Sequence, residues 1–522
     1  MPKKSIIVLS LILLASALLG SSVLTRGHFW GDDFATYIMQ AKSILTDNMD
    51  EFVTANTFTV TQSSQQIGPA AYPWGFPLML TPVYALIGLS PLALKLPGLM
   101  AYLAFLLIFF FFAKRHFTLI ESLLAVSLFA FNPELLRFLD NILSDIPFLF
   151  LSTLSLLLAD LYIRETNQKR RWILAAITGA VVFTAYFVRT QGLILLASML
   201  LFQAIRFLQQ DDQRRSIMVE TLLTIATFGT LWGISSLIFP GGQSSYLALY
   251  SGFSIDLFIN NIVYYSETFR WFFMTLPRES LIFWVFVLFC FIGLVARFRE
   301  DLLFVLYSAL YLVVLWSWPE RQGYRFIFPL LPLFIYFVFQ GIQTLFGWIQ
   351  TDAKQIGLKI TYTCLFLITT IFAFNAGDNA YINLRNGREI NGPFDPLSFE
   401  TFDFIQNETS PESVIVFFKP RAMYLMTNRY ALALTECDRI PEGDYLVLSK
   451  KVGENLQIPP EQIDECNLPL KKVFENRRFI VYELLDLNLS LLPIWNQICH
   501  SSTLLTIHHQ IHVMVSTEIF NG

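Results

Sequence analysis

The stretch MPKKSIIVLSLILLASALLGSSVL, residues 1–24, opens the chain with two lysines followed by a long apolar run. A helix needs roughly 20 apolar residues to cross the hydrocarbon core of a bilayer, and this run supplies them. Because the apolar part of a cleaved signal peptide is shorter, about 7–15 residues, we favour an uncleaved first span. Lys3 and Lys4 then predict a cytoplasmic N-terminus, since basic residues gather on that side of a membrane.

The composition of the whole chain agrees with this start. Of its 522 residues, 54% are hydrophobic and only 15% are charged, whereas soluble domains carry about 25% charged residues. We therefore predict a mainly α-helical protein that crosses the membrane many times. The formal net charge of −4 argues against a nucleic-acid partner.

Hydropathy and the distribution of Lys and Arg predict about eleven spans. After the first, they cover approximately 92–112, 118–133, 146–163, 172–188, 193–207, 217–239, 279–296, 302–318, 326–349 and 358–374. With this arrangement every basic cluster falls on the side of Lys3. The prediction is a transmembrane domain over residues 1–375, in the plasma or inner membrane, with everything after Phe374 outside.

The first outer loop, residues 25–91, contains one segment that fits a span poorly. YPWGFPLMLTPVYALIGLSP, residues 72–91, carries four prolines and is short for a crossing. Counting it as a span would also put the next basic cluster on the wrong side. We interpret it as a helix lying at or partly in the outer interface.

Residues 376–485 change character and predict a small outward-facing α/β domain. SFETFDFIQNETS (398–410) is typical of a helix, SVIVFFK (413–419) and DYLVLSK (444–450) of strands, and KKVFENRRFIVYEL (471–484) of a hairpin. The last stretch, 486–522, has no clear pattern. We expect a poorly ordered tail there, in preference to a metal site at His508, His509 and His512.

The five cysteines are sparse and include no CxxC pair. Cys290 and Cys364 lie inside apolar runs, where a cysteine is usually a small hydrophobic residue. Cys437 and Cys466 lie in the predicted outer domain and could form a disulfide there.

Ionisable residues of both signs gather in the loops that the predicted topology places at the outer face. They are Asp32 and Asp33 after the first span, Asp140 and Asp145 in NPELLRFLDNILSDIPF, Arg189 in FVRTQGL, and Glu320, Arg321 and Arg325 in WPERQGYRFIFPLLP. Each has a structural alternative: the aspartates could cap helices, and the arginines could be interfacial snorkelling residues. Four such loops on one side favour a functional site.

This set of residues suits one kind of chemistry. A carboxylate can take a proton from a hydroxyl nucleophile, and arginines can hold a phosphate through paired, charge-assisted hydrogen bonds. An apolar cavity open to the bilayer could admit an isoprenoid tail. The combination predicts transfer of a sugar from a polyprenyl phosphate carrier.

Four motifs in this order resemble the GT-C superfamily of integral-membrane glycosyltransferases. They are GDDFATYIMQA (31–41), the segment from Tyr72 through the second span, NPELLRFLDNILSDIPFLFL (132–151), and RQGYRFIFPLLPLF (321–334). Among these enzymes, the chain looks most similar to bacterial relatives of the protein O-mannosyltransferases and the lipid A aminoarabinose transferase. The resemblance covers roughly residues 3–374 and implies an inverting hexosyl or pentosyl transferase of the cell envelope.

The resemblance also implies roles for individual residues. Asp32 matches the catalytic aspartate, Asp33 the acid beside it, and Asp145 the acid of the second loop. We expect acceptor or metal association at Asp145 and Glu320, phosphate binding by Arg189, Arg321 and Arg325, and a substrate cavity lined by Tyr37, Tyr72, Trp74 and Tyr324. If a divalent cation such as Mg, Mn or Zn takes part, Asp32 and Asp145 would hold it.

One departure from the family bears on specificity. The aminoarabinose transferases carry a Lys-Pro pair in the first loop, whereas QQIGPAAYPWGFP (65–77) has no lysine. Phosphate binding would then depend on arginines, and aminoarabinose is not favoured as the sugar. The sequence leaves open the sugar, the lipid, glycan or protein acceptor, and which of Asp32 and Asp33 is the base.

Two other classes of function remain as alternatives. A transporter or lipid flippase would use the acids for coupling, but such proteins often show inverted repeats and broken helices, which we do not find in the sequence. A non-catalytic relative in cell-envelope assembly would not need both Asp32 and Asp33.

Overall fold

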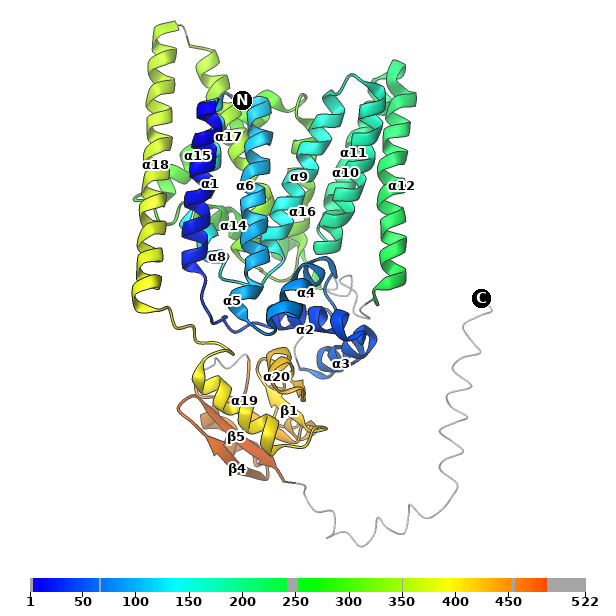
Figure 1. Cartoon of the computed structure of the whole chain (residues 1–522), viewed down its shortest axis with the longest axis vertical. Helices are drawn as coiled ribbons and strands as arrows, with labels where there is room; N and C mark the ends of the chain where they lie inside the picture. The colour runs from blue at the N-terminus through cyan, green and yellow to red at the C-terminus, as the bar shows by residue number, and fades with distance from the viewer. Residues whose placement is uncertain (1–2, 65–66, 242–251, 350, 452–455, 486–522) are drawn as a thin grey trace, which may run out of the picture.

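The protein divides into a helical bundle and a smaller α/β unit at one end of it (Figure 1). The structure is a computed structural model and describes residues 3–64, 67–241, 252–349, 351–451 and 456–485. The C-terminal tail, with the histidines considered above, lies outside the described residues. Short helices from the first loop lie between the bundle and the α/β unit, so that loop separates the two layers.

Within the described residues, nine apolar helical segments are long enough to cross a membrane. They are built on α1 (Lys3–Val23), α6 (Leu96–His116), α9 (Asp145–Arg164), α10 (Gln168–Val188), α11 (Gly192–Gln209), α12 (Arg214–Ile238), α15 (Glu279–Arg297), α17 (Leu331–Gly347) and α18 (Thr351–Asn386). Each coincides with a predicted span. The chain is therefore a multi-pass membrane protein, as its composition predicted.

The other two predicted spans form shorter apolar helices, α7 (Leu119–Ala130) and α16 (Leu302–Ser317). Thr118 begins α7 with a capping box, in which its side chain accepts from the Glu121 N–H and Glu121 accepts from the Thr118 N–H. With 12 residues, α7 reaches only about 18 Å, less than the thickness of the bilayer core. The predicted total of about eleven spans includes these two shorter helices.

The loop after α1 folds into α2 (Asp33–Thr46), α3 (Met49–Gln62), α4 (Gly75–Ile87) and α5 (Pro91–Leu94). α4 is the segment that we expected at the membrane interface, and it has only 13 residues. It packs against α2 and α10. Gly75 permits the second contact, because a Cβ there would lie 2.5 Å from the Phe187 carbonyl oxygen.

A buried ion pair holds the start of this loop to the bundle. Lys95 Nζ lies 2.6 Å from Asp140 Oδ1, and both side chains are almost fully buried. The Thr25 N–H also donates to Asp140, and Lys95 donates to the Thr25 and Gly27 carbonyl oxygens. Asp140, which the sequence groups with the acids of the site, thus positions the chain where it leaves α1.

We expect Lys95→Met to destabilise the protein by about 3–5 kcal/mol, because it leaves the Asp140 carboxylate buried without a cation. The measurement is the unfolding midpoint of purified protein in detergent. The double variant Lys95→Met/Asp140→Leu, which removes both charges, should recover most of the loss. An unchanged midpoint for the single variant would contradict a tight buried pair.

The remaining helices complete the bundle. They are α8 (Pro133–Phe138), α14 (Ile255–Arg270) and several 3₁₀ turns, η1 (Asp211–Gln213), η3 (Trp271–Phe273) and η4 (Tyr324–Leu330). η4 leads directly into α17, which is almost entirely buried at the centre of the bundle.

The C-terminal unit is a five-stranded sheet with the strand order β2-β1-β3-β5-β4. Its elements are α19 (Pro396–Glu408), β1 (Val414–Phe417), α20 (Pro420–Thr427), β2 (Tyr430–Leu432), η5 (Ile440–Glu442), β3 (Tyr445–Ser449), η6 (Pro460–Cys466), β4 (Leu470–Glu475) and β5 (Phe479–Leu484). β1 runs parallel to β2 and β3, and β5 is antiparallel to β3 and β4. The predicted helix, both predicted strands and the hairpin are present. α18 continues past the domain boundary that we predicted at residue 375.

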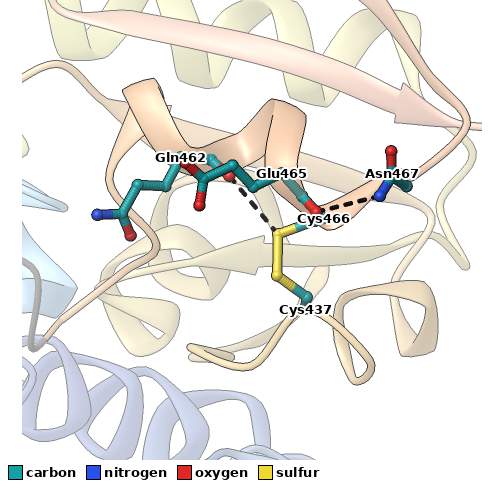
Figure 2. The surroundings of a disulfide bond; sticks show 5 residues. All are labelled: Cys437, Gln462, Glu465, Cys466 and Asn467. Atoms are coloured by element: carbon teal, nitrogen blue, oxygen red, sulfur yellow. Dashed lines mark hydrogen bonds between the residues drawn. A yellow bond between two sulfur atoms is a disulfide. The ribbon is translucent and has the colours of Figure 1, made fainter.

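Cys437 and Cys466 form a disulfide in this unit (Figure 2), which is the pairing that the sequence suggested. It joins the segment after β2 to the last residue of η6. Cys290 is half-buried, whereas Cys364 is exposed on the surface of α18.

Candidate active site

The two adjacent aspartates lie where the loop from α1 enters α2. Asp33 is the first residue of α2 and Asp32 precedes it, but the Asp32 side chain makes no capping hydrogen bond. Capping of α2 therefore does not explain Asp32, and each carboxylate has other partners.

Asp33 is held by a tyrosine and an arginine from distant parts of the chain. The Tyr72 hydroxyl donates to Oδ1 at 2.6 Å, and Arg325 Nη1 donates to Oδ2 at 2.9 Å. Burial alone would raise the pKa of Asp33, but Arg325 and Tyr72 stabilise its charged form and hold the pKa below its usual value. Asp33 is thus a stable anion that anchors Arg325.

Asp32 has a different environment. Its Oδ2 lies 3.6 Å from Lys419 Nζ of the α/β unit, and its Oδ1 is buried without a hydrogen-bond partner. Burial raises the pKa of Asp32, although Lys419 and Arg421 oppose this. A carboxylate with one free oxygen and a raised pKa has the properties of a general base.

A second ion pair lies at the start of α9. Asp145 Oδ1 accepts from Arg189 Nη1 at 2.5 Å, while Asp145 Oδ2 is buried without a partner. Ser144, just before it, contacts both the Arg189 guanidinium and the Tyr37 hydroxyl, the latter at 2.9 Å. This connects Asp145 to α2 through Tyr37.

Both arginines contact the same phenyl ring. The guanidinium carbons of Arg189 and Arg325 lie 4.8 Å and 5.6 Å from the centre of the Phe326 ring. Each guanidinium is thus positioned by a carboxylate and an aromatic ring. Nη2 of Arg189 makes no hydrogen bond with any described residue, so a donor remains for a ligand.

These residues surround a cavity of about 420 Å³. Six predicted site residues line it: Asp33, Tyr37, Tyr72, Arg189, Glu320 and Arg325. The lining also includes apolar side chains of α11 and α16, namely Leu193, Ile194, Val314 and Leu315. The cavity therefore combines charged groups, two arginines and two carboxylates, with hydrocarbon side chains.

Five predicted site residues do not line this cavity. Asp32 precedes Asp33, and Asp145 is paired with Arg189, so each adjoins a residue that does. Trp74 donates to the Pro240 carbonyl oxygen, and Tyr324 lines a neighbouring groove with Trp271. Arg321 is exposed, with its guanidinium over the Tyr264 ring.

The sequence analysis missed two basic residues, Lys419 and Arg421, at the start of α20. They follow β1 directly, in FFKPRAM (417–423), and lie close to Asp32. Two cationic residues just beyond the carboxyl end of a buried parallel strand are a signal for a site, although nothing local connects them with the first loop.

The carboxylates fit a divalent cation poorly. Among the described residues, no cluster of three or more His, Cys, Asp or Glu side chains could hold a metal. Asp32 already faces Lys419, and Asp145 is paired with Arg189, whereas Mg²⁺ and similar ions need several oxygen ligands whose charge is not already balanced. We therefore assign no step to a metal.

The bundle and the loop helices form a polytopic membrane protein whose fold matches that of solved GT-C enzymes, as the motifs predicted. The chain is similar to ArnT from Cupriavidus metallidurans bound to undecaprenyl phosphate, with a TM-score of 0.58 and 11% identity over 93% of this chain and 99% of that one. It is also similar to the oligosaccharyltransferase AglB from Archaeoglobus fulgidus in complex with an inhibitory peptide and a dolichol-phosphate, with a TM-score of 0.56 and 10% identity over 94% and 75% of the two chains.

The same archaeal oligosaccharyltransferase in complex with Zn and sulfate matches with a TM-score of 0.58 and 10% identity, over 91% of this chain and 73% of that one. At such identities the likeness concerns the fold. No protein-family model and no curated protein sequence matches the chain.

Proposed function

We propose that this protein is a glycosyltransferase that moves a sugar from a polyprenyl-phosphate donor to a hydroxyl acceptor at the outer face of the membrane. The cavity carries the proposal, because its lining combines two arginines held by carboxylates with apolar side chains of α11 and α16. The arginines suit a phosphate, and the apolar side chains suit an isoprenoid chain. The binding of undecaprenyl phosphate by ArnT and of dolichol-phosphate by AglB supports this choice of donor.

In the proposed reaction Asp32 accepts the proton of the acceptor hydroxyl. The acceptor oxygen attacks the anomeric carbon, the bond from that carbon to the phosphate oxygen breaks, and the configuration inverts. Polyprenyl phosphate leaves with its electron pair, and Arg189 and Arg325 stabilise its charge. Donors that are already held in place lower the barrier because they need no reorganisation during the reaction.

The proposed orientation places the N-terminus in the cytoplasm and the α/β unit outside. The Cys437–Cys466 disulfide supports this, because disulfides persist in oxidising compartments outside the cytosol. The substrates would then meet at the outer leaflet.

The test of the function is sugar transfer in membranes that contain the protein, with Asp32→Asn alongside. A panel of radiolabelled polyprenyl-phosphate sugars is supplied, and the label that leaves each carrier is measured. Loss from one donor, only with the wild type, would support the transferase and identify its sugar. A labelled carrier that crosses the membrane intact would instead indicate a flippase.

We expect transfer to decline on the acid side of neutrality as Asp32 takes up a proton. A base must be ionised, and burial raises the pKa of Asp32 above the ordinary value of 3.8. Activity is therefore retained above that raised pKa and lost as the pH falls through it. The measurement is kcat/KM against pH, and an acid limb at or below 3.8 would contradict Asp32 as the base.

A further inference from the structure

The α/β unit forms hydrogen bonds with the first loop at residues 62–64. The Ser64 N–H donates to the Ala433 carbonyl oxygen at 2.9 Å, and the Ala433 N–H donates to Ser63 Oγ at 3.0 Å. The Thr435 N–H donates to Ser64 Oγ at 3.2 Å, and Arg439 Nη2 donates to the Gln62 carbonyl oxygen at 2.6 Å. One backbone–backbone bond and three bonds that involve side chains therefore fix residues 62–64 to the segment that follows β2.

Arg421 makes a further contact between the α/β unit and the first loop. Its side chain is fully buried, and its Nη2 donates to the Pro69 carbonyl oxygen at 2.5 Å. Nε donates to Asn56 Oδ1 at 3.1 Å, and the Asn56 amide in turn donates to the Ala70 carbonyl oxygen. The guanidinium also lies 5.8 Å from the centre of the Tyr72 ring. One side chain thus connects α3, the loop and the tyrosine that bonds Asp33.

The residues held in this way form a wall of the cavity. Ile67, Gly68, Pro69 and Tyr72 all line it. Gly68 has a φ of +94°, and a Cβ there would lie 2.9 Å from the Tyr72 hydroxyl and 3.5 Å from Arg421 Nη1. The backbone therefore passes close to both groups, and a shift at residues 68–69 would displace Tyr72 as well as the wall.

We propose that Arg421 is a positioning residue through which the α/β unit sets the affinity of the cavity for its lipid-phosphate donor. The inference rests on the proposed function, because it takes the cavity as the donor site. Arg421 itself does not line the cavity. It acts on the wall through Pro69 and Tyr72, and its charge also lowers the pKa of Asp32, so its loss deforms the wall without removing a catalytic group.

The test compares Arg421→Met with a matched variant, Arg429→Met. Arg429 is a second buried arginine of the same unit, but among the described residues its side chain bonds only to Gln406, Thr409 and Thr427 of that unit. Both variants remove a buried guanidinium and report the general cost to folding. At a pH well above the pKa of Asp32, where the base stays ionised without the Arg421 charge, we expect Arg421→Met to raise the donor KM by roughly tenfold or more with kcat within about threefold, because the donor loses a correctly placed binding wall. Arg429→Met should leave the donor KM unchanged, and Arg421→Lys should recover part of the affinity.

A second measurement, the Kd of unlabelled polyprenyl phosphate, separates this inference from the proposed function. A wild type that neither binds this probe nor transfers sugar contradicts the function. A wild type that does both, with equal donor KM and Kd in the Arg421→Met and Arg429→Met proteins, overturns the positioning role alone. A fall in kcat at unchanged KM would also overturn it.

Discussion

Asp32→Asn is expected to lower kcat for sugar transfer by roughly 10²–10⁴-fold, the usual contribution of a general base. Asparagine keeps the shape of the side chain but cannot accept the proton. Donor KM should stay close to the wild-type value, because Asp32 does not line the cavity and the Asp33–Arg325 pair is untouched. Initial rates at varied donor concentration measure both parameters.

Asp33→Asn is the matched comparison, one residue away. It removes the anion that holds Arg325 and Tyr72, so we expect a raised donor KM together with a reduced kcat. If Asp33→Asn reduced kcat alone while Asp32→Asn were fully active, the base would be Asp33. An unfolding midpoint near that of the wild type for both variants would exclude general misfolding as the cause.

The helical bundle could be predicted well because the signals for each span lie within a short stretch of sequence. Each long span is an uninterrupted apolar run, and basic residues at alternate ends orient the runs. α7 and α16 were also found, and the predicted runs 118–133 and 302–318 were already among the shorter spans. Within the α/β unit, the alternation of side chains predicted the hairpin of β4 and β5. The three-residue β2 and the short α20 were missed because they are too brief to show a periodic pattern.

The site was harder to predict because its pairs join distant residues. Sequence spacing suggested capping for Asp32 and Asp145 as readily as function, and only the geometry shows that neither side chain caps its helix. Asp140 looked like Asp145 in the sequence, yet it is buried against Lys95. Asp145 is paired as well, with Arg189, and no local pattern indicates which of the two pairs lies at the cavity.

The contribution of the α/β unit to the site depends on how this unit packs against the first loop. Lys419 approaches Asp32, and Arg421 approaches Pro69, across more than 350 residues of sequence. Only a structure can reveal such contacts, because they depend on the relative placement of the two units.

Arg325→Met is expected to lower kcat/KM for the donor by roughly 10²–10³-fold, as for removal of one fixed donor to a developing anion. Arg325 lines the cavity, and it is aligned by Asp33 and Gln322. The leaving phosphate should therefore lose a charge-assisted contact that strengthens as the bond breaks, so kcat should fall along with affinity. Arg321→Met is the control four residues earlier, since Arg321 is exposed and contacts Tyr264 and Asn261 outside the cavity.

The loss in Arg325→Met could also arise from Asp33, which is left without its cation. The double variant Arg325→Met/Asp33→Asn distinguishes the two causes because it removes the uncompensated charge. If the phosphate contact matters, the double variant stays as inactive as Arg325→Met, even where its unfolding midpoint recovers. Recovery of kcat/KM in the double variant, or an equal loss in Arg321→Met, would mean that Arg325 only balances the charge of Asp33 and that the phosphate binds elsewhere.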